Sequence, residues 1–222
     1  MKKFALAIVA ALAAVGAQAA TVGFQYGLPV ALSTTEINQT GALGLFDSSL
    51  GTLTGATLSI SGGASFTFGG RNDAAGLETA NITSSTTLLW SSSLAAVNPF
   101  IGETMGLSAS SGFQSYAVGQ SRSFGPIADS ETQVDDLAAI LASLQAAGGG
   151  SFNLSCLSLS GLGVLGGGGN IATSQATQAG CGASIVYEFT AAPPPPVPEP
   201  ASLALVGVAL AGLAAASRRR KA

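Results

Sequence analysis

The middle of the chain alternates apolar residues with small hydroxylated residues, in short runs separated by glycine. Residues 56–60 (Ala-Thr-Leu-Ser-Ile) and residues 65–68 (Ser-Phe-Thr-Phe) follow this two-residue period. The same period places Ile185, Tyr187 and Phe189 on one face of a later segment. Successive side chains of a strand point to opposite faces, so this period is typical of strands with one buried face. The pattern predicts an all-β domain over residues 20–190, an antiparallel β-sandwich of roughly nine short strands.

Glycine-rich positions divide this region further. Paired glycines at 62–63 and 69–70 are predicted to be turns on either side of the strand at 65–68. Residues 161–170 include a run of four glycines and are predicted to form a mobile loop. Additional strands are predicted at residues 22–26, 30–35, 81–89 and 114–118.

The phase of the alternation changes beside the first cysteine. Phe152, Leu154 and Cys156 share one phase, whereas Leu157 and Leu159 occupy the other. A phase change inside a strand predicts either a β-bulge near Cys156 or burial of both faces of the strand.

One segment follows a helical period instead. Its apolar residues recur at spacings of three and four, at Val134, Leu137, Ile140, Leu141 and Leu144. Ser130 and Gln133 match a capping box, and glycines 148–150 supply a stop signal. We therefore expect one inserted helix over about residues 131–147.

The N-terminal end is almost continuously apolar. Two lysines precede an apolar run at residues 4–15, and Ala17 and Ala19 form a small-x-small cleavage site. This order predicts a secretory signal peptide over residues 1–19, which the Sec translocon would export. We expect cleavage after Ala19, with Ala20 as the second choice, and an uncleaved N-terminal anchor is the alternative.

The C-terminal end contains a second apolar run. A proline-rich linker at residues 191–200 favours extended polyproline II and precedes an uncharged apolar segment at residues 201–217. As a helix this segment would span about 25 Å, slightly less than a hydrocarbon core of about 30 Å. We expect a single transmembrane helix here. The basic residues after it predict a cytoplasmic C-terminus: these are Arg218, Arg219, Arg220 and Lys221.

The tripeptide Pro198, Glu199 and Pro200 stands directly before this apolar segment. With the segment and the terminal arginines it resembles the PEP-CTERM sorting signal of Gram-negative, biofilm-forming bacteria, over residues 197–222. The resemblance implies that an exosortase, an integral-membrane transpeptidase-like enzyme, recognises these three residues and cleaves near them. It also implies a transient inner-membrane intermediate, followed by transfer to the cell surface or release into the extracellular matrix.

The region between the two ends, residues 20–192, is called the body here and has a family resemblance of its own. Residues 46–54 (FDSSLGTLT), followed by the strand at 56–60, resemble the opening of choice-of-anchor E domains. Residues 166–170 and the segment at 182–190 resemble the end of those domains, whereas residues 71–145 depart from them. Choice-of-anchor E domains are exported β-sandwiches found beside several alternative sorting tails. The resemblance implies a fold and a surface role, with no established biochemical activity.

Composition narrows the chemistry that the body can perform. The chain has 222 residues, no histidine and only 9% charged residues. Residues 20–192 carry two basic and ten acidic residues, a formal net charge of −8, which argues against nucleic-acid binding. Without histidine the chain cannot form a Ser-His-Asp or Cys-His catalytic site. The commonest protein ligand of zinc is also absent. We expect no catalytic residues, no bound metal and no cofactor.

The two cysteines, Cys156 and Cys181, are predicted to form a disulfide, because an exported protein meets an oxidising compartment. The alternative is that the two cysteines are small buried apolar residues that form no bond.

The carboxylates offer two further candidate sites. Asp135 and Asp136 are interpreted as the charged N-terminal end of the expected helix. Residues 72–78, with Asn72, Asp73 and Glu78, form either an ordinary Asx turn or a calcium site.

Two hypotheses for function follow. The leading one is a non-enzymatic surface or matrix protein, associated with exopolysaccharide or biofilm and processed by an exosortase. The alternative is a carbohydrate-binding or adhesin-like β-sandwich module, with calcium dependence as one version of it. A glycosidase would need two facing carboxyl groups roughly 5–9.5 Å apart, and is a third, weaker option. Trp90 is predicted to lie in the core rather than on a sugar-binding surface.

Overall fold

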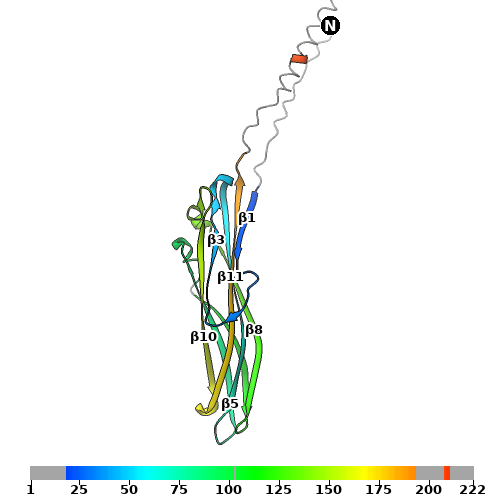
Figure 1. Cartoon of the computed structure of the whole chain (residues 1–222), viewed down its shortest axis with the longest axis vertical. Coiled ribbons are helices and arrows are strands. Elements are labelled where there is room, and N and C mark those ends of the chain that lie inside the picture. The colour runs from blue at the N-terminus through cyan, green and yellow to red at the C-terminus, as the bar shows by residue number, and fades with distance from the viewer. Residues whose placement is uncertain (1–18, 103, 194–207, 211–222) are drawn as a thin grey trace, which may run out of the picture. The chain divides into compact units, whose positions relative to one another are not determined.

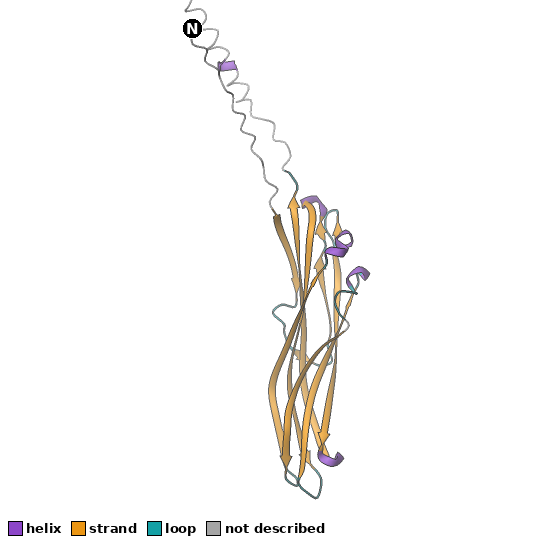
Figure 2. Cartoon of the chain, turned by 180° about the vertical axis from the view of Figure 1, so that it is seen from behind, coloured by secondary structure: helices purple, strands orange, loops and turns teal. Residues whose placement is uncertain are grey.

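The computed structural model describes residues 19–102, 104–193 and 208–210. The chain divides into two units, residues 1–191 and residues 192–222. The first unit is a sandwich of two antiparallel sheets (Figure 1), so the all-β prediction is confirmed. Figure 2 shows that strands form nearly all of it and that the helical turns are short.

The first sheet has the strand order β1-β11-β5-β8. These strands are β1 (Ala19–Tyr26), β11 (Ile171–Ala191), β5 (Gly51–Asn72) and β8 (Ser121–Asp136). The short strand β2 (Ser33–Thr34) pairs with the middle of β11, on the same edge as β1. All pairings in this sheet are antiparallel.

The second sheet has the strand order β3-β10-β6-β7. These strands are β3 (Asn38–Gly44), β10 (Ser151–Gly166), β6 (Glu78–Ser92) and β7 (Thr104–Tyr116). Three chain connections, β5 to β6, β7 to β8 and β10 to β11, pass from one sheet to the other. They lie together at the lower end of the sandwich in Figure 1.

Smaller elements lie at the strand ends. A two-residue parallel pair joins β4 (Phe46–Asp47) and β9 (Gln145–Ala146). The short 3₁₀ turns are η1 (Ser48–Leu50), η2 (Ala95–Val97), η3 (Ala138–Ser143) and η4 (Gly167–Gly169).

The core lies between the two sheets and follows the two-residue period of the sequence. Ile185, Tyr187 and Phe189 of β11 are all buried, as predicted. Trp90 of β6 is also buried, which confirms its core position. On these strands the inward positions are filled mainly by apolar side chains, because alternate residues of each strand face the opposite sheet.

The strand around Cys156 keeps a single register. Phe152, Leu154 and Cys156 are buried, whereas Leu157 and Leu159 are 40% and 45% exposed. No register shift occurs where β10 pairs with β3 and β6. The expectation of a bulge or two-sided burial is therefore wrong. These two leucines simply continue the outward phase of the strand.

Two predicted glycine turns are also wrong, because the glycines lie inside the 22-residue strand β5. Gly62 and Gly70 are both paired on each side, with β11 and with β8. These pairings hold the glycines in extended backbone. The absence of a side chain also has a packing role, since a Cβ at Gly62 would collide with the Leu88 side chain of the facing sheet.

The glycine-rich segment at 161–170 is not a loop for most of its length. Residues 161–166 extend β10 and pair in continuous register with β6, from Gly161 opposite Ser85 to Gly166 opposite Ala80. Only η4 and Asn170 form the turn into β11. A long partner strand satisfies the glycine backbone here, so local flexibility does not decide the structure.

The expected helix over residues 131–147 is wrong. β8 continues to Asp136 and pairs with β5 along its length, which leaves Val134 62% exposed. The edge of β5 offers backbone partners to this segment, and this tertiary pairing overrides the local helical spacing. The helical period survives only in η3, between the buried residues Leu137 and Leu144.

Aromatic rings of β1 pack against glycines of β3 and close one side of the sandwich. A Cβ at Gly41 would overlap the Tyr26 ring, and a Cβ at Gly44 would lie within 2.6 Å of three Phe24 ring atoms. The Tyr187 hydroxyl donates a hydrogen bond of 2.8 Å to the Gly44 carbonyl. These contacts tie the first sheet to the second near the end of the sandwich where β11 ends.

Part of the predicted targeting apparatus lies outside the described residues. This holds for residues 1–18, with Ala17, and for the sorting tripeptide and terminal basic cluster. Of the predicted transmembrane helix at 201–217, the structure describes a helical piece at 208–210. Within the part of the chain that is described, no helix is long and apolar enough to cross a membrane.

Candidate functional site

The predicted signal-peptide cleavage point lies at the start of β1, which pairs with β11. Ala19 is the Cα partner of Thr190, and Ala20 is the partner of Phe189. Cleavage after Ala19 or after Ala20 would therefore shorten β1 by only one or two residues. The mature N-terminal strand would remain paired with β11, so export processing need not disturb the fold.

The end of β11 is held firmly before the proline-rich linker starts. Ala191 pairs with Gly51 of β5, and a register shift occurs between Glu188 and Phe189. The Phe189 ring packs on Phe46 at a centroid distance of 5.1 Å. Aromatic packing of this kind stabilises the folded state by more than the burial of apolar area alone would.

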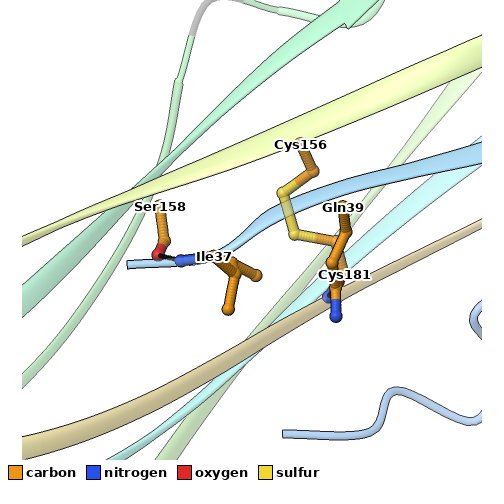
Figure 3. Close-up of a disulfide and its surroundings, with 5 residues drawn as sticks. All are labelled: Ile37, Gln39, Cys156, Ser158 and Cys181. Carbon is orange, nitrogen blue, oxygen red and sulfur yellow. Dashed lines mark hydrogen bonds between the residues drawn. A yellow bond between two sulfur atoms is a disulfide. The ribbon is translucent and has the colours of Figure 1, made fainter. Parts of the chain in front are cut away.

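A disulfide joins Cys156 of β10 to Cys181 of β11 (Figure 3), so the predicted pairing is confirmed. Because β10 and β11 belong to different sheets, the bond links the two layers of the sandwich. Both cysteines are buried, at 0% and 3% exposure. A disulfide that closes a loop of this length stabilises by about 3–4 kcal/mol in the chain-entropy model.

Hydrogen bonds around the disulfide join β3 to the first sheet and join the residue before β3 to β10. The Cys181 N–H donates to the Gln39 side-chain oxygen at 2.9 Å. The Ile37 N–H donates to the Ser158 hydroxyl at 2.9 Å, as Figure 3 shows. The cysteine environment is thus a structural junction.

The carboxylates do not assemble into a reactive cluster. Within residues 19–102, 104–193 and 208–210, no group of three or more His, Cys, Asp or Glu side chains is placed to hold a metal ion. Asp135 and Asp136 lie on β8 instead of a helix, and adjacent strand residues point to opposite faces. Asp135 accepts a hydrogen bond from Gln133, and Asp136 accepts one from the Ala138 N–H.

The loop that joins β5 to β6 is an Asx turn. The Asn72 side-chain oxygen accepts a hydrogen bond from the Ala74 N–H at 2.8 Å. Its amide group donates to the carbonyls of Gly76 and Tyr116. Asp73 pairs with Arg71 at 2.9 Å. Asn72 is fully buried and structural, so the geometry follows the Asx-turn alternative for this segment.

The pKa shifts of the buried tyrosines also indicate that these side chains have structural roles. Burial raises the pKa of the Tyr26 hydroxyl to about 12 and raises that of Tyr187 further. Burial likewise raises the pKa of Tyr116, and the nearby Arg122 charge partly opposes this. Backbone hydrogen bonds from Ser49 and Gly148 lower the pKa of Asp47. All three tyrosines are neutral at physiological pH and cannot act as general bases there.

A shallow depression on the first sheet contains both arginines of the body. Its volume is about 460 Å³, and it is lined by Arg71 and Arg122 with glycine, serine and threonine residues of β5, β8 and β11. Arg71 is paired with Asp73, and Arg122 lies 5.8 Å from the Tyr116 ring centroid. Among the aromatic side chains that the structure describes, Phe113 alone is largely exposed. A sugar-stacking platform of clustered aromatics is therefore not present in this part of the chain.

Comparison with protein families identifies the tail. Residues 196–221 match the PEP-CTERM protein-sorting motif. The match includes the Pro-Glu-Pro tripeptide and the apolar segment after it, together with the terminal basic residues. Proteins with this motif are processed by an exosortase, so the predicted sorting signal is confirmed. The resemblance of the body to choice-of-anchor E domains stays a prediction.

Comparisons with whole proteins add little. No curated protein matches the chain. Two solved structures of infectious bursal disease virus, of the Gx and Gt strains, align at 11% and 13% identity. They cover 79% and 87% of this chain, which spans only 37% and 47% of those chains. Their TM-scores of 0.16 and 0.11 carry no argument about fold or function.

Sequence reasoning missed several contacts that position the end of the sandwich. The sequence pattern predicts neither the hydrogen bond from Tyr187 to the Gly44 carbonyl nor the packing of Tyr26 on Gly41. A tyrosine within an apolar alternation and glycines in a short strand were the available signals. They do not reveal which strands face each other, so the contacts could not be paired from the sequence.

Proposed function

We propose that this chain is an exosortase substrate whose β-sandwich is delivered to the cell surface or extracellular matrix as a non-enzymatic protein. The observation that carries the proposal is the match of residues 196–221 to the PEP-CTERM motif. Pro198, Glu199 and Pro200 are the recognition residues in this proposal. Proline has no backbone N–H and disfavours helical backbone in the residue before it, so these prolines would favour the extended form that the active-site groove of a protease accepts.

The body supports the non-enzymatic part of the proposal. Its described carboxylates are engaged by neighbours or dispersed, and its tyrosines are neutral. The sheets are tied together by one disulfide between their layers. A stable sandwich with a restrained last strand suits a surface protein that must persist outside the cell. On this proposal export runs through Sec in a Gram-negative bacterium, and exopolysaccharide is the surrounding matrix.

A variant of the sorting tripeptide tests the proposal. Glu199→Ala removes the one carboxylate near the motif, so the full chain should accumulate in the inner-membrane fraction. Pro194→Ala is the matched control, since it changes the linker outside residues 196–221 and should leave processing unchanged. Fractionation followed by immunoblotting measures both variants. Equal release of the body from both would overturn the proposed recognition of Glu199.

A second candidate function is binding of an anionic polysaccharide in the arginine depression. The specific observation in its favour is that both cations of an acidic body line one hollow. A glycan array probed with and without calcium separates it from the first function. Binding of acidic glycans that is lost in Arg122→Gln, and retained in a Val134→Gln control, would support it. Absence of glycan binding would remove it.

A further inference from the structure

One edge of the second sheet is left without a partner strand along half its length. β3 pairs with β10 only from Ser151 to Leu157, and the Ser158 N–H then donates to the Ile37 carbonyl. Over residues 159–165, the edge of β10 that faces away from β6 has no strand partner among the described residues. Figure 1 shows this lower half of β10 running to the hairpin that joins it to β11. We call residues 159–165 the free edge.

The backbone groups on the free edge can be assigned from the register. In an antiparallel ladder the N–H and C=O of one residue point to the same side, and the side alternates along the strand. Ser158 points toward β3, and β10 keeps an unbroken register with β6 through Gly166. Ser160, Leu162 and Val164 therefore direct their N–H and C=O groups to the unpaired side.

The free edge lacks the features that keep sheet edges apart. Residues 137–187, which include the whole of β10, contain no charged side chain. The opposite edge of the sandwich is protected. It carries a cluster of charges and a proline on β8: Arg122, Asp129, Glu131, Asp135, Asp136 and Pro126. An exposed edge without charge, proline or cover is a template for pairing with another strand.

Charge favours a second copy of this chain as the occupant. A body with a net charge of −8 repels its own copies wherever charged surfaces meet, and the free edge is the place where that repulsion is smallest. An antiparallel edge is also complementary to itself, so two copies can pair about a two-fold axis. A partner selected by charge would find no group to recognise there.

Exposed leucines flank the centre of the free edge. Leu159 and Leu165 are 45% and 65% exposed on the outer face of the sheet, three residues on either side of Leu162. In a two-fold pairing centred at Leu162, Leu159 of one copy lies opposite Leu165 of the other. This is a non-hydrogen-bonded position, where cross-strand side chains lie closest. The arrangement occurs twice and covers all four leucines.

We propose that two copies of this chain pair edge to edge through residues 159–165, with the two-fold axis at Leu162. Ser160 of one copy forms backbone hydrogen bonds with Val164 of the other, and Leu162 pairs with its own counterpart. Leu162 is the midpoint of the free edge, so this register gives the longest possible pairing. The second sheet then runs continuously through both copies. The inference is independent of how the tail is processed.

Cysteine cross-linking tests the register directly. Both native cysteines are in the disulfide, so one introduced cysteine is the only free thiol. Full-length Leu159→Cys and Leu165→Cys proteins, in mild detergent, are oxidised separately and as a mixture. Cross-linked dimer should form in the mixture, because Cα atoms at such positions lie about 4.5 Å apart. Neither variant alone should cross-link.

Three cross-linking results would contradict the proposed register. Absence of cross-linking in the mixture, or equal cross-linking in one variant alone, overturns the proposed register. A mixture of Leu157→Cys and Leu165→Cys is the control, since these residues are not opposite each other when the axis is at Leu162. Cross-linking there as strong as in the test pair would also overturn it.

Assembly in solution provides the second measurement. The double variant Leu159→Lys/Leu165→Lys places like charges across the pairing and should raise the dimer dissociation constant at least about tenfold. Val134→Lys, on the exposed opposite edge, is the matched control and should leave the constant unchanged. Analytical ultracentrifugation measures both, and urea unfolding confirms that each variant is folded. A wild-type chain that stays monomeric would overturn the proposal.

Discussion

At the scale of single residues, the sandwich depends on how a few polar aromatic groups are satisfied. Tyr187 is buried and donates its hydroxyl proton to the Gly44 carbonyl, which links β11 to β3. Tyr116 is also buried, but its hydroxyl has no hydrogen-bond partner in the structure. The two residues form a natural comparison, because the same substitution removes a satisfied group in one case and an unsatisfied group in the other.

Tyr187→Phe should lower the free energy of unfolding by about 1–2 kcal/mol, because it leaves the Gly44 carbonyl without this donor. Tyr116→Phe should be close to neutral, since the lost hydroxyl made no hydrogen bond. Urea unfolding of the full chain, followed by tryptophan fluorescence, measures both. A larger loss for Tyr116→Phe than for Tyr187→Phe would contradict the assigned contacts.

Tyr26 predicts a loss of stability in alkali. Burial raises its pKa from 10.0 to about 12 in the folded state, so the folded state holds the phenolic proton more tightly than the unfolded chain. The contribution of the protonated Tyr26 hydroxyl to the free energy of unfolding is then complete below about pH 10. It is lost as the pH rises toward about 12. Unfolding free energies measured from pH 8 to pH 12 should fall less steeply for Tyr26→Phe than for wild type. An unchanged slope would show that Tyr26 ionises normally.

At the scale of elements, long strands replace the short ones that the sequence predicts. The disulfide between β10 and β11 joins two such strands across the core. The bond links residues 25 positions apart, and it restricts the unfolded chain while linking the layers of the folded one. The stability of the sandwich should therefore depend on it.

Replacing both cysteines, as Cys156→Ala/Cys181→Ala, should lower the free energy of unfolding by about 3–4 kcal/mol. Reduction of the wild-type chain should have a similar effect, whereas the same reductant should not change the double variant. Urea unfolding with and without dithiothreitol measures this. Equal midpoints for the oxidised and reduced wild-type chain would refute a stabilising role for the bond.

The sequence predicted the fold class and the inward residues of β11 because a two-residue period reports directly on strand faces. It failed at Gly62 and at residues 161–166 because glycine frequency does not reveal which strand lies alongside. It failed at residues 131–136 because the edge of β5 pairs with that segment. The cysteine pairing was predictable because the chain has no other cysteines and its sequence predicts export to an oxidising compartment. Pairing partners across the sandwich are long-range information, and a local pattern does not contain it.

At the scale of the whole molecule, the chain combines a β-sandwich whose two sheets are joined by a disulfide with a C-terminal sorting motif. β1 begins at the predicted signal-peptide cleavage point, and β11, its partner strand, is followed in the sequence by the residues that match the PEP-CTERM motif. Removal of the predicted signal peptide would therefore leave the pairing of β1 with β11 almost complete. The free edge of β10 would add self-association to the delivered protein.

The most direct test of the account is the mass of the mature protein, from cells with and without the exosortase. The account predicts an N-terminus at Ala20 or Thr21 in both. It also predicts a C-terminus near Pro198, Glu199 and Pro200 only where the enzyme is present. Intact-mass and peptide mass spectrometry measure both ends. A C-terminus at Ala222 in both kinds of cell would contradict the account.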